Sequence, residues 1–162
     1  MPRYRMFAAL AAAGLAAGAF VSSVGASPLP TDVRVATFVL VPLTAAAEAP
    51  GPGNTAASGA VTLQIDSRAK KACYAFDVKG LDGPITAAHI HKGAKGVAGA
   101  PVVTFKKAMR GDAWDNCVDI SQELGDELIA NHADYYVNVH TAGFPAGALR
   151  AQLDVKSDTL TR

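Results

Sequence analysis

The 162-residue chain has 15 basic side chains, 14 acidic side chains and four histidines, which gives a formal net charge of +1. This near balance provides no electrostatic attraction for a polyanion. We therefore expect neither a nucleic-acid partner nor electrostatic binding to an anionic membrane. Half of the residues are hydrophobic, which is sufficient for the core of a single globular domain.

The N-terminal segment has the three features of a secretory signal peptide (residues 1–26). Arg3 and Arg5 make a positive start, an apolar alanine-rich run follows, and Val24-Gly25-Ala26 matches the small-residue pattern of a cleavage site. A membrane anchor is the alternative, but the apolar run is short and no basic stop-transfer cluster follows it. We therefore expect cleavage after Ala26, a secreted or periplasmic/cell-envelope protein without a stable membrane span, and one domain over residues 27–156.

Alternation of apolar and polar residues predicts strands separated by turns. Residues 33–41 are rich in β-branched side chains and predict the first strand, which Pro42 should end. Residues 43–58 consist largely of Ala, Pro, Gly and Thr, so we expect a flexible internal loop. The alternating runs 59–66 and 71–78 flank a short polar link, and this arrangement predicts a β-hairpin.

The second half of the chain continues this pattern and adds one helix. Ser121 could cap a short helix, although Gly125 disfavours that helix by about 1 kcal/mol relative to alanine. These elements predict an all-β fold, an antiparallel Greek-key sandwich or barrel with one short helix. We expect Leu124, Leu128 and Ile129 to be the inward residues of the helix. The further strands should span 85–92, 101–105, 134–140 and 148–155. Residues 157–162 should form a frayed polar tail.

The two cysteines, Cys73 and Cys117, are an even count in a chain that we expect to be exported. In an oxidising compartment such a pair predicts one disulfide bond. Closing a loop of that length would stabilise the fold by roughly 4 kcal/mol in the chain-entropy treatment. Thiolate ligands for a metal are the alternative, which the lack of a CxxC pair and of a nearby histidine disfavours.

Three histidines share a position in the alternating pattern. His89 and His91 are two residues apart, so they project from the same face of their strand, and His140 ends a strand whose alternation matches. Apolar neighbours such as Ile90 and Val139 take the opposite, inward face. We predict that the three imidazoles meet on the outer face in a site that can bind copper(II). The alternative is that they are ordinary hydrogen-bonding surface histidines.

Two further polar residues bear on this site. Arg150 falls on the same face of the last strand, where it could attract an anion at the rim of the site or pair with an acidic residue across strands. His132 lies in the link between the helix and the next strand, and we expect it to be exposed to solvent. We assign no catalytic residue, because no nucleophile constellation or phosphate-binding loop is present.

Two long motifs resemble the CHRD domain, a module named for its repeats in chordin that also occurs as a single secreted domain in bacteria. The first motif is Ala88-His-Ile-His-Lys-Gly93 followed by Gly99-Ala-Pro-Val-Val103. The second is Tyr136-Val-Asn-Val-His-Thr141 followed by residues 144–153. The resemblance runs from about residue 33 to residue 153. It implies an extracellular all-β domain, most simply a binding module for an unknown extracellular protein or ligand.

A weaker similarity is to the copper/zinc superoxide dismutases. The predicted fold could take the form of their β-sandwich or of an immunoglobulin-like sandwich. In those enzymes a His-x-His strand and a later strand ending in Val-His supply copper ligands, and an arginine attracts superoxide. The similarity places His89, His91 and His140 as ligands and Arg150 as that arginine. The histidine cluster that holds zinc in those enzymes is missing here, so we do not expect the bimetallic enzyme. A copper protein with superoxide-related redox activity is our alternative to the binding module.

Overall fold

The structure is a computed structural model that describes residues 34–107 and 115–154 and the backbone of residues 159–161. The predicted signal peptide lies outside the described residues, so its cleavage stays a prediction. Within the described part of the chain, no helix is long and apolar enough to cross a membrane. The strands are β1 (Val35–Thr44), β2 (Ser58–Asp66), β3 (Lys71–Lys79), β4 (Ala87–Lys92), β5 (Pro101–Thr104), β6 (Asp115–Asp119), β7 (Tyr135–His140), β8 (Leu149–Gln152) and β9 (Thr159–Thr161).

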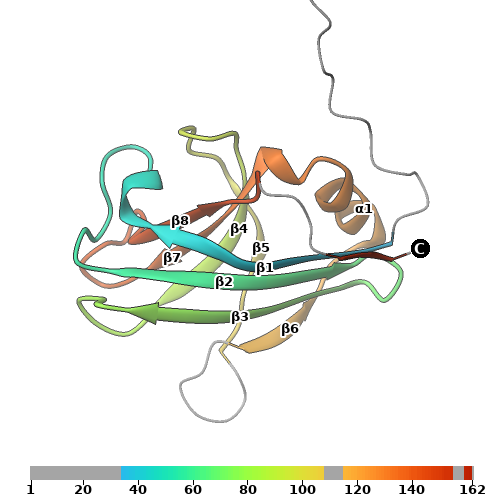
Figure 1. The fold of residues 1–162 in the computed structure, drawn as a ribbon, viewed down its shortest axis with the longest axis horizontal. Helices are drawn as coiled ribbons and strands as arrows, with labels where there is room; N and C mark the ends of the chain where they lie inside the picture. Colours follow the sequence, from blue (N-terminus) through green and yellow to red (C-terminus); the bar gives the residue numbers. More distant parts are fainter. Residues whose placement is uncertain (1–33, 108–114, 155–158, 162) are drawn as a thin grey trace, which may run out of the picture.

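Eight strands follow one another in a single curved sheet in the order β5-β4-β7-β8-β1-β2-β3-β6 (Figure 1), and every pairing is antiparallel. Its two edges lie close together. Tyr74 of β3 exchanges hydrogen bonds with the backbone of Lys106, just past β5, and the Tyr74 and Phe105 rings are 4.1 Å apart. Asn116 of edge strand β6 also donates from Nδ2 to the Lys107 carbonyl, just past β5, at 3.3 Å. The all-β prediction is confirmed, and the sheet is a nearly closed barrel because its two edges lie close together.

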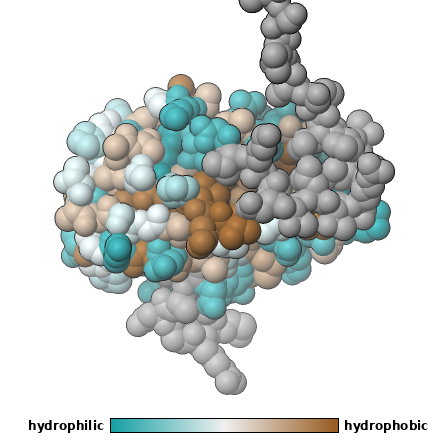
Figure 2. All heavy atoms as spheres, in the orientation of Figure 1, coloured by the Kyte–Doolittle hydropathy of each residue, from teal (hydrophilic) through white to brown (hydrophobic). Residues whose placement is uncertain are grey.

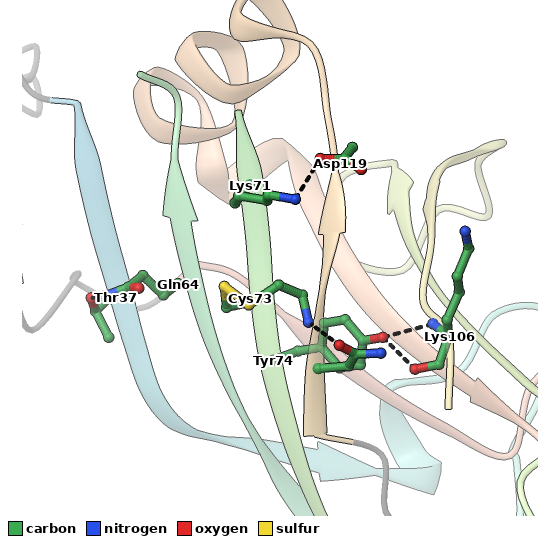
Figure 3. The surroundings of a disulfide bond; sticks show 9 residues. Thr37, Gln64, Lys71, Cys73, Tyr74, Lys106 and Asp119 are labelled. Carbon is green, nitrogen blue, oxygen red and sulfur yellow. Dashed lines mark hydrogen bonds and ion pairs between the residues drawn. A yellow bond between two sulfur atoms is a disulfide. The ribbon is translucent and has the colours of Figure 1, made fainter. Parts of the chain in front are cut away.

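The predicted hairpin and the predicted disulfide lie side by side in this barrel. β2 and β3 pair along their whole lengths, and Cys73 of β3 lies directly opposite Cys117 of β6. The two cysteines, which are 44 residues apart in sequence, form a disulfide with Cα atoms 4.0 Å apart (Figure 3). Two pairs further along the β3–β6 ladder, Lys71 Nζ lies 2.6 Å from Asp119 Oδ1. The bridge therefore fixes edge strand β6 to the hairpin.

β1 is longer than predicted. Pro42 does not end the strand but pairs with Ala60, and β1 continues to Thr44. Proline is tolerated here because it lies past an irregularity in the β1–β2 ladder, and because the described pairing of β1 with β8 is confined to Thr44. At the irregularity Leu40 has a φ of +50°. The bulge bends the strand around the barrel.

The segment predicted as a flexible loop, 43–58, is partly regular structure. Both of its ends belong to strands, and a 3₁₀-helix, η1 (Ala45–Ala47), follows β1 directly. Backbone hydrogen bonds join Gly53 N–H to the Ala45 carbonyl and Asn54 N–H to the Ala148 carbonyl, at 3.0 and 2.9 Å. The loop is thereby attached to the chain before β8, and its flexibility stays a prediction.

Part of the tail that was predicted to be frayed is a strand. Residues Thr159–Thr161 form β9 and pair with Val35–Thr37 at the start of β1. Polarity was the only ground for predicting a frayed end. Polar composition does not reveal that the start of β1 has backbone N–H and C=O groups available for pairing. A short extended segment can form hydrogen bonds with those groups.

The predicted helix is confirmed as α1 (Gln122–Ala130), and a short 3₁₀-helix, η2 (His132–Asp134), follows it. The Ser121 hydroxyl accepts a hydrogen bond from Leu124 N–H at 3.1 Å, which is an N-cap. Leu128 and Ile129 are buried and Leu124 packs partly buried against the core. Close packing explains the glycine at position 125 of the helix, since a Cβ there would lie 2.8 Å from Ser67.

The apolar core fills the barrel with inward side chains from β1, β2, β4, β7 and β8. Its largest fully buried apolar members include Phe38, Leu43, Leu63, Ile65, Ile90 and Leu149. On the outside, Figure 2 shows an apolar patch over the middle of β1, where Val39 and Leu40 at the bulge are 48% and 63% exposed.

Candidate metal centre

The three predicted histidines come together. His89 and His91 project from β4, and His140 ends β7, which pairs with β4. One ring nitrogen from each lies within 4.8 Å of the others. The closest pair is His89 Nδ1 and His140 Nε2 at 3.1 Å. The alternation argument is therefore confirmed for the convergence of the imidazoles.

The protein sets the proton positions of two of these rings. His91 Nδ1 lies 2.8 Å from the Gly99 carbonyl oxygen, and His140 Nδ1 lies 3.1 Å from the Pro145 carbonyl oxygen. A carbonyl only accepts, so each Nδ1 carries the proton and each Nε2 carries the lone pair. Metal-binding histidines in proteins are commonly held in this way by an outer backbone acceptor.

Burial keeps the three rings uncharged. Burial lowers the pKa of His89 to about 4, with further lowering by the charges that His140 and His91 would carry. The pKa values of His91 and His140 are also lowered, chiefly by burial, while the carbonyls of Gly99 and Pro145 oppose the shift. The cluster is therefore neutral at neutral pH, and neutral imidazole is the form that binds metal.

The face that carries the histidines is not the open outer surface that we predicted. His91 is buried, and His89 and His140 are half-buried. Asn138 and Gln152, polar residues of the same face, are also buried. Alternation places a side chain on a face but does not say what covers that face. Here the loop after β4 folds back and hydrogen-bonds to it, while the loop after η1 reaches Asn138.

Arg150 is the clearest correction, because it does not lie at an exposed rim. Only 1% of the residue is exposed, and its guanidinium donates to the carbonyl oxygens of Ala94 and Val97 and to Gln152 Oε1 at 2.7–3.0 Å. These acceptors are two backbone carbonyls and an amide, and the nearby Glu48 carboxylate interacts with the guanidinium through its charge. Arg150 holds the loop after β4 against the sheet, and attraction of an anion stays a prediction.

Comparison with known proteins now identifies the family. A model of the CHRD domain matches residues 39–153 of this chain. The chain belongs to the CHRD domain family. No curated protein and no solved structure matches it, and the comparisons do not show the weaker similarity to superoxide dismutases. The matched region contains all three histidines of the cluster.

The CHRD domain supports its cluster with Tyr136, which the sequence alone did not assign to the site. The Tyr136 ring stacks on His91 with centroids 4.8 Å apart and planes 10° apart, and Arg150 Cζ lies 3.4 Å from the same ring centroid. Its hydroxyl accepts a hydrogen bond from Gly99 N–H at 3.1 Å. Tyr136 therefore fixes both the His91 ring and the residue whose carbonyl holds it. Its position two residues before Asn138 on the same face was the available signal.

Asn138 and Glu48 form the other side of this polar face. Asn138 Nδ2 donates to both carboxylate oxygens of Glu48, at 2.9 and 3.1 Å. Burial raises the pKa of Glu48 to about 7, although the Asn138 hydrogen bond and the Arg150 charge oppose this. At Gly147, which has a φ of +146°, a Cβ would lie 2.5 Å from Glu48 Oε2. No local sequence signal marks Glu48, since it reaches the site from the loop after η1.

His132 does not take part in the cluster. The prediction that it is exposed to solvent is wrong, because its ring is half-buried and packs on Phe38 with centroids 5.2 Å apart. Its Nδ1 lies 2.5 Å from the Leu153 carbonyl oxygen. His132 therefore joins the chain after α1 to the chain after β8, and it provides a histidine control outside the candidate metal centre.

Proposed function

We propose that this CHRD domain binds copper(II) through His89, His91 and His140. The observation that carries the proposal is His91 Nε2, a buried nitrogen without a hydrogen-bond partner among the described residues. Its proton sits on the other ring nitrogen, so what faces the cluster is a bare lone pair. A buried acceptor left without a partner is unfavourable, and a cation would satisfy it.

The chemistry of the donor set supports copper in particular. Imidazole nitrogen suits copper and zinc, and copper(II) binds most tightly of the divalent first-row ions to a given nitrogen site. Three protein ligands also leave coordination positions open for a small molecule. Copper would supply one-electron redox chemistry when bound, which keeps the superoxide-related activity as a candidate. The chain itself holds the imidazoles neutral, orients two of them and shields His91 from water.

The compartment belongs to the same proposal. We place the protein outside the cytoplasm, secreted or in the periplasm or cell envelope. The Cys73–Cys117 disulfide supports this, because such bonds persist in oxidising compartments. The N-terminal signal-peptide pattern supports it independently.

Calorimetric titration of the metal-free protein with copper(II) tests the proposal. Wild type should bind one ion, and His140→Ala should weaken binding more than tenfold because one of three ligands is lost. His132→Ala is the matched control and should bind like wild type. Electron paramagnetic resonance of the copper-loaded protein should show coupling to three imidazole nitrogens. Equal affinity in wild type and His140→Ala would refute the site, provided that circular dichroism shows both proteins folded.

A second candidate function is the binding of an unknown extracellular protein. The apolar patch at the β1 bulge supports it, since the neighbouring residues Val39 and Leu40 are large apolar side chains that are exposed to solvent. Leu40→Asp should abolish recovery of a specific partner from the native extracytoplasmic fraction. Val97→Asp, which changes another exposed apolar residue in the loop after β4, should not. Equal recovery by all three proteins would exclude the patch.

A further inference from the structure

A second buried polar atom lies beside the histidine cluster without a partner. Among the described residues two buried side-chain atoms make no hydrogen bond, His91 Nε2 and Asn138 Oδ1. Asn138 is 3% exposed and pairs with His89 across the β4–β7 ladder. Directly paired residues of neighbouring antiparallel strands project to the same face, so the Asn138 side chain is adjacent to the candidate metal centre.

The orientation of the Asn138 amide is set by its neighbours. Glu48 accepts two hydrogen bonds from Nδ2, so this donor end is turned toward Glu48. A Cβ at position 147 would lie 2.8 Å from Nδ2, and the glycine there leaves room for the amide. Oδ1 is the other end of the amide. It therefore points away from Glu48, as an acceptor with no donor.

No neighbouring cation or hydroxyl of the same face supplies that donor. The Arg150 guanidinium donates to Ala94, Val97 and Gln152, and the Tyr136 hydroxyl lies against the backbone of Gly99. The protonated nitrogens of His91 and His140 do not fill the role, because each Nδ1 lies against a backbone carbonyl, and His89 Nδ1 lies against His140 Nε2. Glu48 lies at the other end of the amide, where both of its oxygens contact Nδ2. No described residue donates to Asn138 Oδ1, which leaves a bound molecule as the source of a donor.

We propose that Asn138 Oδ1 accepts a hydrogen bond from a small ligand held at the open position of the metal. The inference rests on the proposed copper site. The ligand must have a lone pair for the metal and an O–H or N–H for the amide, as water and hydroperoxide do. Azide and halide ions bind metals but have no hydrogen to donate. Asn138 thus favours ligands that can donate a hydrogen bond over these anions. A small ligand can reach the site from solvent on the side of His89 and His140, which are only half-buried.

Azide titration of copper-loaded protein tests this inference. In wild type, azide must displace a water molecule that is anchored to Asn138. In Asn138→Leu that water loses its hydrogen bond, so azide should bind about fivefold more tightly, which corresponds to about 1 kcal/mol. Asn54→Leu is the matched control, because Asn54 is also buried (5% exposed) but its amide bonds to Ala56 and Asp82, away from the cluster. Its azide affinity should equal that of wild type.

A crystal structure of copper-loaded wild type provides a test that does not depend on a variant's folding. A non-protein atom bound to copper should lie within about 3.2 Å of Asn138 Oδ1. If copper binds but that contact is missing, or azide affinity is equal in wild type and folded Asn138→Leu, the inference is overturned and the copper site stands. If wild type binds no copper at the histidines, the proposed function fails and the inference fails with it.

Discussion

Arg150→Lys separates a structural arginine from one that attracts anions. Lysine keeps the positive charge, so an electrostatic role would survive the change. It does not keep the planar fork that reaches three acceptors, the Ala94 and Val97 carbonyls and Gln152, nor the stacking on Tyr136. Because Arg150 is almost fully buried, water cannot replace the lost donors.

The expected loss of stability follows from those contacts. A lysine can retain about one of the three hydrogen bonds, and each lost bond from a charged donor contributes about 1.5 kcal/mol. We therefore expect Arg150→Lys to lower the free energy of unfolding by about 3 kcal/mol, or to lower Tm by roughly 12 °C for a domain of this size. Urea unfolding followed by circular dichroism, with the disulfide intact, measures this.

Arg34→Lys is the control for that measurement. The Arg34 guanidinium makes one partly exposed ion pair with Asp126 at 2.8 Å, so its replacement should cost less than about 1 kcal/mol. The reasoning is refuted if Arg150→Lys unfolds at the same urea concentration as wild type. It is also refuted if Arg150→Gln, which lacks the charge, weakens azide binding to the copper-loaded protein while leaving stability unchanged.

Three further predictions concern the rest of the domain. The folded pKa of Glu48 is raised to about 7 from an ordinary value of 4.5, so wild type should lose stability as pH rises from 4.5 to 7. Glu48→Gln should not lose stability over this range, because glutamine does not titrate. The free energies of unfolding of the two proteins, measured in urea across the range, should therefore diverge by about 1 kcal/mol, a value reduced for the partial exposure of Glu48. Gly125→Ala should lower stability by about 1–3 kcal/mol despite alanine's helix preference, because its Cβ would lie 2.8 Å from Ser67. Gly83→Ala is the control: position 83 has open space around it, so alanine there should leave Tm nearly unchanged when both variants are compared by thermal unfolding. Reducing the disulfide should lower the free energy of unfolding by about 4 kcal/mol, and an unchanged urea midpoint in reductant would contradict this.

The buried polar face has a consequence for how the domain is held together. On the inside of the barrel, β4, β7 and β8 contribute apolar side chains. On the other side, the same strands contribute His91, Asn138, Arg150 and Gln152, which are also buried. Gln152 Nε2 alone donates to the carbonyls of Gly93, Ala133 and Tyr135. This polar network attaches surrounding loops to the sheet, so the candidate metal centre is built into a rigid part of the fold.

Local patterns in the sequence were sufficient for the strands, the helix cap and the shared face of the three histidines. These features depend on the two-residue period of a strand and on capping between residues close in sequence. Contacts with distant parts of the chain seldom change either of them. The disulfide also followed from an even count of cysteines in a chain expected to be exported. The shared face of His89, His91 and His140 was predictable because alternation gives each side chain one of only two faces, and the pairing of β4 with β7 then brings the three rings together.

Only the tertiary structure decided what covers that face. Arg150 alternates outward, as predicted, and Gln152 shares its face, yet loops from elsewhere in the chain fold over them and make them part of the interior. Glu48 reaches Asn138 across 90 positions of sequence, and Thr159–Thr161 completes an edge of β1 that no local pattern reveals. Burial, tautomer and hydrogen-bond partner are set by contacts between distant segments. Alternation therefore placed the ligands, and the packing of loops against the barrel determined their chemistry.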